Sequence, residues 1–339
     1  MAAALALSWR GRGRTAPNPN VGCVIVRDGR IVSRGWTQPG GRPHAEAMAL
    51  DGIDATGADV YVTLEPCAHE SNRGPACSDL LAEARPARVI VAARDPDERT
   101  NGKGIDRLRA AGIEVVEDIL ADEARRAMAG FFMRQAKGRP HVTLKLATSL
   151  DGQVALPDGS SQWITGPEAR RHAHIERAQA DMIVVGRGTV ETDAPSLNVR
   201  IDGLGDRSPT RAILSRDAGI VAKLQLSEAA PSWLRLEGPD AIAGLDNVDH
   251  LLVEGGAGAA SAFIAANLVD RLLLYRAPIL IGSGLSALGD IGLARLDDAH
   301  GQWRLVETRM LGTDRLEVYE RSRRSDKKSR CRAQPSGRV

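Results

Sequence analysis

The sequence predicts an α/β protein built from two domains. Short apolar runs rich in valine and isoleucine alternate with helix-forming segments, which is typical of a sheet covered by helices. The chain has 339 residues, enough for two domains of ordinary size with a core each. Lys137-Gly138-Arg139-Pro140 interrupts the alternation, so we predict domains at 1–138 and 139–321, followed by a tail at 322–339.

The elements of the first domain alternate between strand and helix. Residues 1–8, rich in alanine and leucine, predict its first helix. Four runs of β-branched and apolar residues predict strands at 21–26, 59–64, 88–92 and 113–117. The segments between and after them predict helices at 44–50, 77–84, 104–111 and 121–132. This order indicates an α/β sandwich.

The second domain is predicted to hold more strands than helices. Strands are expected at 141–148, 181–186, 210–215, 251–254, 271–280 and 315–320, and helices at 167–180 and 257–268. We find no repeat of the first half here, so we expect the two domains to do different things. No third glycine follows Gly186-Arg187-Gly188 at the place that a complete dinucleotide fingerprint requires. The glycine-rich turn after 251–254 either approaches a phosphate or only joins a strand to a helix.

One imidazole, two thiols and one carboxylate lie at the ends of predicted elements. His44 begins a helix, Cys67 follows strand 59–64, Cys77 begins the next helix, and Glu46 lies two residues beyond His44. This is the residue set of zinc deaminases, in which zinc-activated water attacks a ring carbon that carries an amino group. Three protein ligands leave a fourth position open, as in catalytic zinc sites, and Glu46 is then free to move protons. Helix N-termini also favour thiolates.

Each of these residues alone would be an ordinary loop histidine or core cysteine. The interpretation as a zinc site depends on the four together, and nine residues separate Cys67 from Cys77 where the simplest signature has two. Of the other cysteines, Cys23 is expected in the core and Cys331 in the tail. Four cysteines make no disulfide framework at this length, so we expect a reducing, cytoplasmic compartment. We expect neither a membrane span nor a signal peptide.

Positive charge is concentrated at the C-terminus. Residues 321–339 hold eight Arg or Lys and one acid, about +7, so the preceding 320 residues carry −5 of the net charge of +2. We expect the tail to be a disordered, solvated appendage rather than a nucleic-acid-binding segment. The rest of the chain has no basic excess to bind a polyanion.

Blocks in both halves resemble the family of bifunctional bacterial riboflavin-biosynthesis enzymes. These enzymes join a diaminohydroxyphosphoribosylaminopyrimidine deaminase to a 5-amino-6-(5-phosphoribosylamino)uracil reductase. In the first half the blocks are PNPNVGCVIV at 17–26, HAE at 44–46 and YVTLEPCAH at 61–69. In the second they are KLATSLDG at 145–152, SQWIT at 161–165, GTVETDAPSL at 188–197 and EGG at 254–256. Their order and spacing extend the resemblance over about residues 1–320.

The resemblance implies a cytidine-deaminase-like α/β/α sandwich followed by a dihydrofolate-reductase-like α/β domain. It implies zinc on His44, Cys67 and Cys77, with Glu46 as the catalytic acid/base. The residues that it places at the pyrimidine or its ribose phosphate in the first domain are Asn18, Asn20, His69 and Arg73. Those that it places at the NADPH site are Ala147, Ser161, Trp163, Ile164, Thr189, Asp193, Gly255 and Gly256. Those that it places at the phosphoribosyl substrate of the reductase are Lys145, Thr165, Arg177, Ser196, Leu197, Arg200 and Glu254.

The family would therefore deaminate 2,5-diamino-6-(5-phospho-ribosylamino)pyrimidin-4(3H)-one with zinc and then reduce its ribosyl group to ribityl with NADPH. It also suggests a homo-oligomer whose partner is this small molecule, with no nucleic acid and no membrane. The sequence departs from the family in a longer loop before Cys77 and in Ser215, where an Asp usually ends the strand. Two alternatives stay open: a tRNA or other nucleic-acid base deaminase with an appended non-catalytic domain, and a zinc-stabilised binding module. The first would need basic and aromatic surface, and the second has no use for Glu46.

Overall fold

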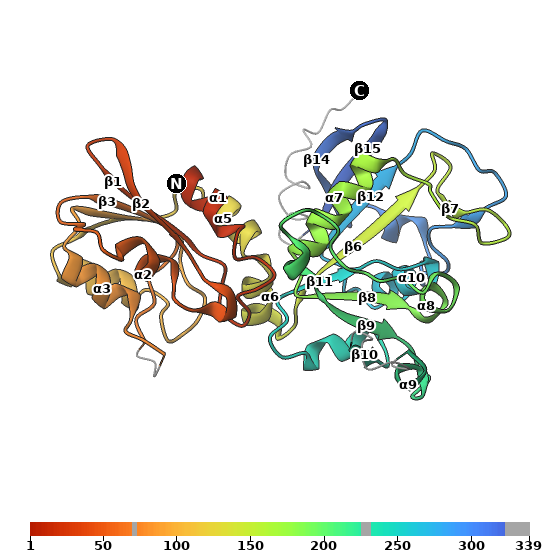
Figure 1. Ribbon diagram of the computed structural model, residues 1–339, viewed down its shortest axis with the longest axis horizontal. Helices are drawn as coiled ribbons and strands as arrows, with labels where there is room; N and C mark the ends of the chain where they lie inside the picture. The colour runs from red at the N-terminus through yellow and green to blue at the C-terminus, as the bar shows by residue number, and fades with distance from the viewer. Residues whose placement is uncertain (70–72, 225–231, 323–339) are drawn as a thin grey trace, which may run out of the picture. The chain divides into compact units, whose positions relative to one another are not determined.

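The computed structural model describes residues 1–69, 73–224 and 232–322 and divides into two compact units. The first unit comprises 1–141, 179–181 and 243–250, and the second comprises the remaining described residues (Figure 1). The predicted tail at 322–339 lies, except for its first residue, outside the described residues, and so does Cys331. Among the described helices, none is both long and apolar enough to cross a bilayer.

The first unit is a five-stranded sheet between two layers of helices. Its strands, in the spatial order β2-β1-β3-β4-β5, are β1 (Gly22–Arg27), β2 (Arg30–Trp36), β3 (Asp59–Leu64), β4 (Arg88–Ala93) and β5 (Glu114–Val116). β3, β4 and β5 are parallel, whereas β1 is antiparallel to both β2 and β3. The helices are α1 (Ala2–Ser8), α2 (Ala45–Leu50), α3 (Cys77–Ala84), α4 (Lys103–Ala110), α5 (Ala121–Ala127) and α6 (Ala129–Lys137). This confirms the predicted α/β/α sandwich.

Two glycines let helices approach the sheet at backbone distance. A Cβ at Gly22 would lie 1.9 Å from the carbonyl oxygen of Ala4 in α1, and one at Gly35 would lie 2.1 Å from that of Ala45 in α2. Such distances exclude any side chain there. α2, which begins directly after His44, is therefore fixed closely against β2.

Two predictions for the first half were incomplete. Strand β2 was not predicted, although Asp28 and Gly29, both with positive φ, form the hairpin turn before it. The helix predicted at 121–132 is instead two helices, because Met128 between α5 and α6 has φ −106° and ψ 26°.

Helix α6 packs against the segment 243–250. A Cβ at Gly130 would lie 2.5 Å from the carbonyl oxygen of Asp249. Arg134 donates hydrogen bonds to Asp249 Oδ1 at 3.0 Å, to the carbonyl of Leu245 at 3.1 Å and to that of Val248. Part of the sequence beyond 141 thus completes the first unit.

The second unit contains an eight-stranded sheet, in the spatial order β10-β9-β8-β11-β6-β12-β15-β14, and the separate pair β13-β7. The strands are β6 (His141–Thr148), β7 (Gln153–Ala155), β8 (Met182–Gly186), β9 (Thr210–Leu214), β10 (Trp233–Leu236), β11 (His250–Val253), β12 (Arg271–Arg276), β13 (Leu285–Ser286), β14 (Trp303–Leu311) and β15 (Asp314–Arg321). The helices are α7 (Pro167–Ala178), α8 (Arg187–Asp193), α9 (Ile220–Leu224) and α10 (Ala257–Ala265). Of the short 3-10 turns, η1 (Pro39–Gly41) belongs to the first unit, and η2 (Gly205–Arg207), η3 (Pro239–Gly244) and η4 (Leu296–Ala299) follow later in the chain.

The six strands and two helices predicted for this half are present. The prediction of a strand over 271–280 was too long, because β12 ends at Arg276, where its pairing with both neighbours β6 and β15 also ends. The prediction missed β7, β10, β13 and β14, and the helices α8 and α9. β14 is largely exposed at the edge of the sheet and shows no continuous buried run.

Candidate functional sites

The three predicted zinc ligands meet in the first unit. His44 immediately precedes α2, Cys77 is the first residue of α3, and Cys67 follows β3 by three residues. Their ligand atoms all lie within 4.8 Å of one another. His44 Nδ1 is 3.2 Å from Cys77 Sγ and 3.6 Å from Cys67 Sγ. A tetrahedral zinc ion would hold nitrogen and sulfur ligands about 3.5 Å apart, so these residues fit zinc.

Burial and mutual hydrogen bonding give the two thiols opposite proton affinities. A hydrogen bond from Cys77, with a further contribution from His44, lowers the pKa of Cys67 to about 4 despite burial. The same bond and burial raise the pKa of Cys77 well above its usual range. A bound dication would hold both sulfurs as thiolates, with loss of the Cys77 proton.

Glu46 lies next to this cluster in the first turn of α2. Its side chain is 3% exposed. Burial raises the pKa of Glu46 to about 7, against the opposing charge of His44. A carboxyl group with such a pKa can both accept and donate a proton near neutral pH.

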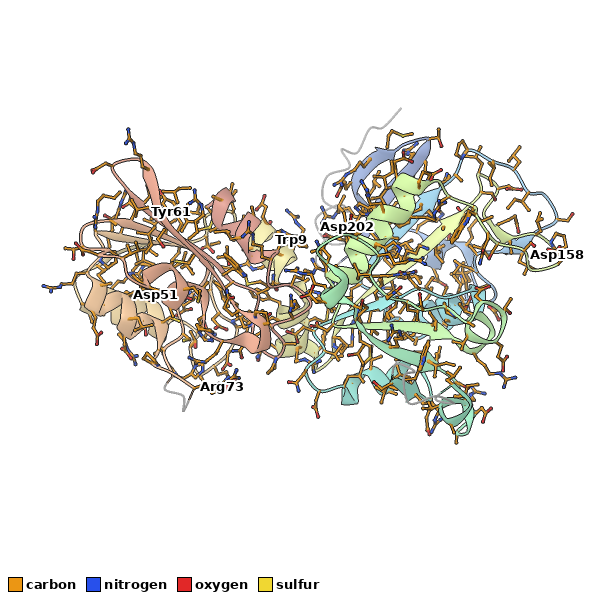
Figure 2. The ribbon with its side chains drawn as sticks, viewed as in Figure 1. Trp9, Asp51, Tyr61, Arg73, Asp158 and Asp202 are labelled. Carbon is orange, nitrogen blue, oxygen red and sulfur yellow. The ribbon has the colours of Figure 1, made fainter. Side chains whose placement is uncertain are left out.

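A pocket of about 350 Å³ opens beside the zinc ligands. His44 and Cys77 line it together with Pro43, Arg42 and Arg73. Arg73, labelled in Figure 2, donates a hydrogen bond to the carbonyl of Gly40 at 2.7 Å. Arg42 was not among the predicted residues, although its place two residues before a zinc ligand was a usable signal. Two guanidinium groups at a pocket suit an anionic ligand.

The other predicted residues of this site differ in accessibility. Asn18 Nδ2 lies 3.3 Å from His44 Nε2 and donates to the carbonyl of Gly41 at 2.7 Å. His69 is half-buried, with its Nδ1 3.5 Å from Thr100 Oγ1. Asn20 is 3% exposed, and its amide donates to backbone oxygens 3.2 Å away in the first unit. Asn20 therefore joins the last residues of α1 and α5 through its amide.

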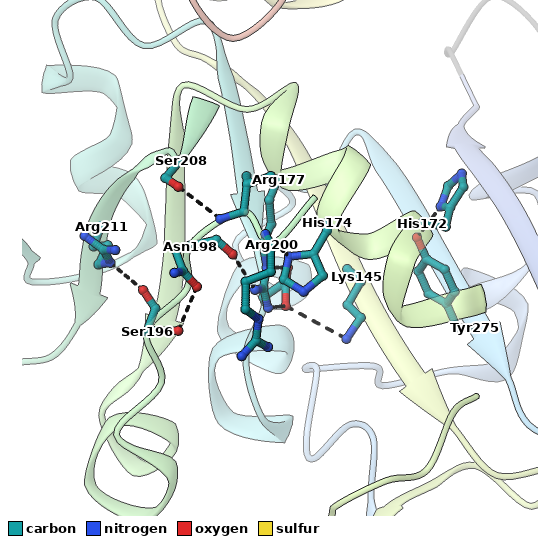
Figure 3. Close-up of polar contacts among 12 residues, drawn as sticks. Lys145, His172, His174, Arg177, Ser196, Asn198, Arg200, Ser208, Arg211 and Tyr275 are labelled. Carbon is teal, nitrogen blue, oxygen red and sulfur yellow. Dashed lines mark hydrogen bonds and ion pairs between the residues drawn. The ribbon is translucent and has the colours of Figure 1, made fainter. Parts of the chain in front are cut away.

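A polar cluster in the second unit surrounds Glu254, directly after β11, and Figure 3 labels its partners Arg177 and Lys145. Arg177 from α7 donates two hydrogen bonds to its carboxylate, at 2.7 and 2.8 Å, and a third to the carbonyl of Asn198 at 3.1 Å. Lys145 Nζ on β6 lies 3.9 Å from the same carboxylate. Burial acts to raise the pKa of Glu254, but Arg177 and Lys145 outweigh it, and the net direction is downward. Three residues predicted at the reductase substrate are thus brought together.

Other residues predicted at the reductase substrate lie on the segment that carries Asn198. The hydroxyl of Ser196 donates to Asn198 Oδ1 at 2.8 Å. The backbone N–H of Arg200 donates to His174 Nδ1 at 3.2 Å. Leu197 is 4% exposed, so its side chain belongs to the interior.

Some of the predicted cofactor residues lie at the carboxyl ends of two adjacent parallel strands. β8 and β11 are paired, and the glycine-rich segments that follow them meet where Gly256 N–H donates to Thr189 Oγ1 at 3.2 Å. Asp193 is exposed at the end of α8, and Ala147 is half-buried on β6. Backbone groups at such strand ends are a common place for a cofactor.

The remaining predicted residues lie on the segment 161–165. Trp163 is 64% exposed, with the Arg170 guanidinium 4.6 Å from its ring centre. Arg170 also donates to the carbonyl of Thr165 at 2.5 Å. Ser161 and Ile164 are half-buried.

Two residues close to the Glu254 cluster, His172 and Tyr275, were not predicted. His172 Nδ1 lies 2.7 Å from the hydroxyl of Tyr275, which is 1% exposed, and Lys145 Nζ is 6.0 Å from the Tyr275 ring centre (Figure 3). No local motif marks this pair, because it depends on the packing of α7 against β12.

Comparison with known proteins covers both halves of the chain. Residues 1–93 match the cytidine and deoxycytidylate deaminase zinc-binding region, and residues 140–316 match the RibD C-terminal domain. The riboflavin biosynthesis protein RibD of Escherichia coli K12 is 38% identical, with 93% of this chain and 96% of that protein covered. RibD of Mycobacterium tuberculosis is 40% identical, with 93% and 95% covered. The chain belongs to the RibD family.

Solved structures agree with this membership in the RibD family. A diaminohydroxyphosphoribosylaminopyrimidine deaminase/5-amino-6-(5-phosphoribosylamino)uracil reductase from Thermotoga maritima superimposes with a TM-score of 0.82 at 31% identity, covering 95% of this chain and 97% of that one. RibD of Acinetobacter baumannii gives a TM-score of 0.82 at 32% identity, covering 95% and 98%. The fold predicted by resemblance, deaminase-like and then reductase-like, is confirmed.

Membership in the RibD family confirms the predicted function as a bifunctional deaminase and reductase of riboflavin biosynthesis. It confirms a zinc-binding deaminase region, to which the cluster of His44, Cys67 and Cys77 corresponds, and implies NADPH for the reductase. The alternative with a non-catalytic second domain is wrong, because that half matches the RibD C-terminal domain.

Proposed function

We propose that residues 1–138 form the deaminase domain and residues 139–321 the reductase domain, with 322–339 outside both. The positions of the two family matches, 1–93 and 140–316, support this division. So does the placement of the zinc ligands in the first unit and of the Glu254 cluster in the second.

The substrate proposed for the first step is 2,5-diamino-6-(5-phospho-ribosylamino)pyrimidin-4(3H)-one. Water adds at C2 of the ring, the amino group there leaves as ammonia, and a carbonyl remains. In the second step NADPH reduces the opened ribosyl group to ribityl. The single observation that carries this proposal is the match of both halves, in this order, to RibD proteins.

In the deaminase domain, His44, Cys67 and Cys77 would hold zinc, whose Lewis acidity lowers the pKa of water toward ~7. Glu46 would accept a proton from the attacking water and deliver it to the leaving amino group. Its burial beside the ligands and its pKa of about 7 support this role. The proposed contacts of the substrate in this domain are Asn18, Asn20, His69 and Arg73.

In the reductase domain, NADPH supplies the hydride. The proposed cofactor residues are Ala147, Ser161, Trp163, Ile164, Thr189, Asp193, Gly255 and Gly256. The proposed substrate residues are Lys145, Thr165, Arg177, Ser196, Leu197, Arg200 and Glu254. None of these side chains needs to attack covalently, so positioning of cofactor and substrate should supply much of the rate.

We also propose a cytoplasmic homo-oligomer that acts on a small phosphoribosyl pyrimidine and binds neither nucleic acid nor membrane. The described cysteines, Cys23, Cys67 and Cys77, are all free thiols, which supports a reducing compartment. The low net charge of the first 320 residues gives no field that would attract a polyanion.

A coupled assay on the purified protein tests the proposal. Ammonia release and NADPH oxidation are followed separately after addition of the diaminopyrimidinone ribosyl phosphate. Both signals are expected, and a zinc chelator should remove ammonia release while leaving NADPH oxidation with the deaminated substrate. Ammonia release without NADPH oxidation would refute the reductase proposal, and the absence of both signals would refute both activities.

A further inference from the structure

Glu65, two residues before the zinc ligand Cys67, has a buried carboxylate that accepts four hydrogen bonds from the backbone. It is 2% exposed and lies directly after β3. One oxygen, Oε2, accepts from the backbone N–H groups of Asp95 at 3.2 Å and Gly102 at 3.0 Å. The other, Oε1, accepts from those of Gly104 at 3.1 Å and Ile105 at 3.3 Å. All four of its acceptor positions are thus in use.

These donors belong to the loop after β4 and to the start of α4. The first N–H groups of a helix have no partner within the helix, and they carry a positive partial charge. A buried carboxylate that accepts hydrogen bonds from these N–H groups satisfies both the donors of the helix and its own oxygens. The side chain of Glu65 therefore joins the turn that carries Cys67 to the N-terminus of α4.

The backbone of the same turn touches α4 directly. A Cβ at Gly104 would lie 2.0 Å from the carbonyl oxygen of Pro66 and 3.3 Å from Glu65 Oε1. Only glycine permits this approach. Pro66, which lies between Glu65 and Cys67, is thereby fixed against the helix.

The first residues of helix α3 contact the same turn at Cys67. The carbonyl of Cys67 accepts from the backbone N–H of Ser78 at 3.1 Å and from its hydroxyl at 3.0 Å. Cys67 Sγ accepts from the backbone N–H of Cys77 at 3.3 Å. Arg107 on α4 donates to Ser78 Oγ at 3.2 Å, which links the two helices. Three successive residues, 65 to 67, are therefore held by two helix N-termini.

The loop that Glu65 fixes also reaches a proposed substrate residue. Thr100, which lies between the donors Asp95 and Gly102, is fully buried and has its hydroxyl 3.5 Å from His69 Nδ1. One carboxylate thus supports both sides of Cys67, since His69 lies two residues beyond it.

We propose that Glu65 is a positioning residue that sets the place of Cys67 in the zinc site through α4, and with it the affinity for zinc and the geometry around the metal. This inference rests on the zinc-dependent deaminase function. Groups that orient metal ligands typically contribute about 10–100-fold to metal affinity. The four hydrogen bonds of the Glu65 carboxylate all come from backbone N–H groups, so its effect would be exerted through Cys67 and through the loop that reaches His69.

The variant Glu65→Gln tests the inference with almost no change in volume. A glutamine offers one oxygen, so either the pair Asp95 and Gly102 or the pair Gly104 and Ile105 would face an NH₂ group. We expect zinc affinity, measured by competition with a chromophoric chelator, to fall about 10–100-fold. The visible absorption of the cobalt(II)-substituted protein, which reports ligand geometry, should also change, while NADPH oxidation with the deaminated substrate should not.

Two further variants separate positioning from a general loss of stability. Gly104→Ala should weaken zinc binding and alter the cobalt spectrum as Glu65→Gln does, because it displaces Pro66 from α4 and so gives an independent readout if Glu65→Gln does not fold. Ile25→Val removes a methyl group from a fully buried side chain of β1 and should lower stability without altering either measurement.

The outcomes distinguish this inference from the proposed function. If the wild-type protein binds zinc and releases ammonia while Glu65→Gln and Gly104→Ala keep wild-type zinc affinity and cobalt spectrum, Glu65 has no positioning role. The same conclusion follows if Ile25→Val reproduces their effects. A wild-type protein that binds no zinc would overturn the deaminase proposal together with the role of Glu65.

Discussion

The replacement Glu254→Gln measures how much the buried carboxylate contributes to the second unit. The side chain of Glu254 is 8% exposed and that of Arg177 is 15% exposed, and the two are joined by hydrogen bonds of 2.7 and 2.8 Å. Glutamine keeps the size but removes the charge, so the guanidinium and the nearby Lys145 lose their counterion. Breaking a buried pair by removing one partner costs about 3–5 kcal/mol.

Scanning calorimetry can resolve this loss, since a two-domain chain need not unfold in one transition. Zinc should raise the transition of the unit that holds His44, which identifies the other transition as that of the second unit. A domain of this size shifts by about 2–4 °C per kcal/mol, so we expect this transition to fall by about 6–20 °C. The double variant Arg177→Met, Glu254→Gln should recover part of the loss, because the buried guanidinium that lost its counterion is also removed.

The pH dependence gives a second check on the same pair. Because the folded protein holds the pKa of Glu254 below its unfolded value, the stabilisation is present above the unfolded pKa of ~4.3 and is lost as pH falls through the folded value. The unfolding temperature of the second unit should therefore fall in strongly acidic buffer for the wild type, and it should depend less on pH in Glu254→Gln. A transition that Glu254→Gln leaves within 2 °C of wild type, or an unchanged acid dependence, would show that the pair is not a net source of stability.

Three further predictions address the two sites and one backbone position. Glu46→Gln should reduce ammonia release by about 10²–10⁴-fold while zinc content and NADPH oxidation with the deaminated substrate stay at wild-type values, and persistent deamination would remove Glu46 from the proton path. Arg200→Ala should raise the reductase KM for the phosphorylated substrate by about 10–100-fold with little change in kcat, as for a lost hydrogen bond to a charged group, and an unchanged KM would place Arg200 outside the site. Ala194 has φ +40° at the end of α8, so Ala194→Gly should stabilise the second unit by about 1 kcal/mol in calorimetry, and a lower unfolding temperature would contradict a strained backbone there.

Strands that are buried on both faces were predictable, whereas exposed ones were not. β3 and β6 were predicted with their observed bounds, because their apolar runs end at turn residues. β2 has three exposed residues at its start, among them Arg30, and so lacks a buried run. Its only clear signal was the Asp28-Gly29 turn, which favours a hairpin.

The zinc ligands could be predicted because zinc chemistry restricts both the residue types and their placement at element ends. The pairing of Arg177 with Glu254 could not, because the two are 77 positions apart and meet only through the packing of α7 beside β11. The resemblance placed both residues at the substrate of the reductase but gave no indication that they form an ion pair with each other. The four hydrogen bonds to Glu65 were equally invisible, since their donors are backbone groups that any sequence would supply.

The packing of α6 against 243–250 bears on attempts to produce the deaminase as a separate fragment. A gene fragment that ends near 141 would encode Arg134 without its three acceptors around Asp249, and it would uncover the Gly130 side of α6. In such a fragment, the side of α6 that the segment 243–250 covers in the intact chain would be exposed to solvent. A stand-alone deaminase would therefore require either a graft of 243–250 onto the new C-terminus or a redesigned, polar outer surface for α6.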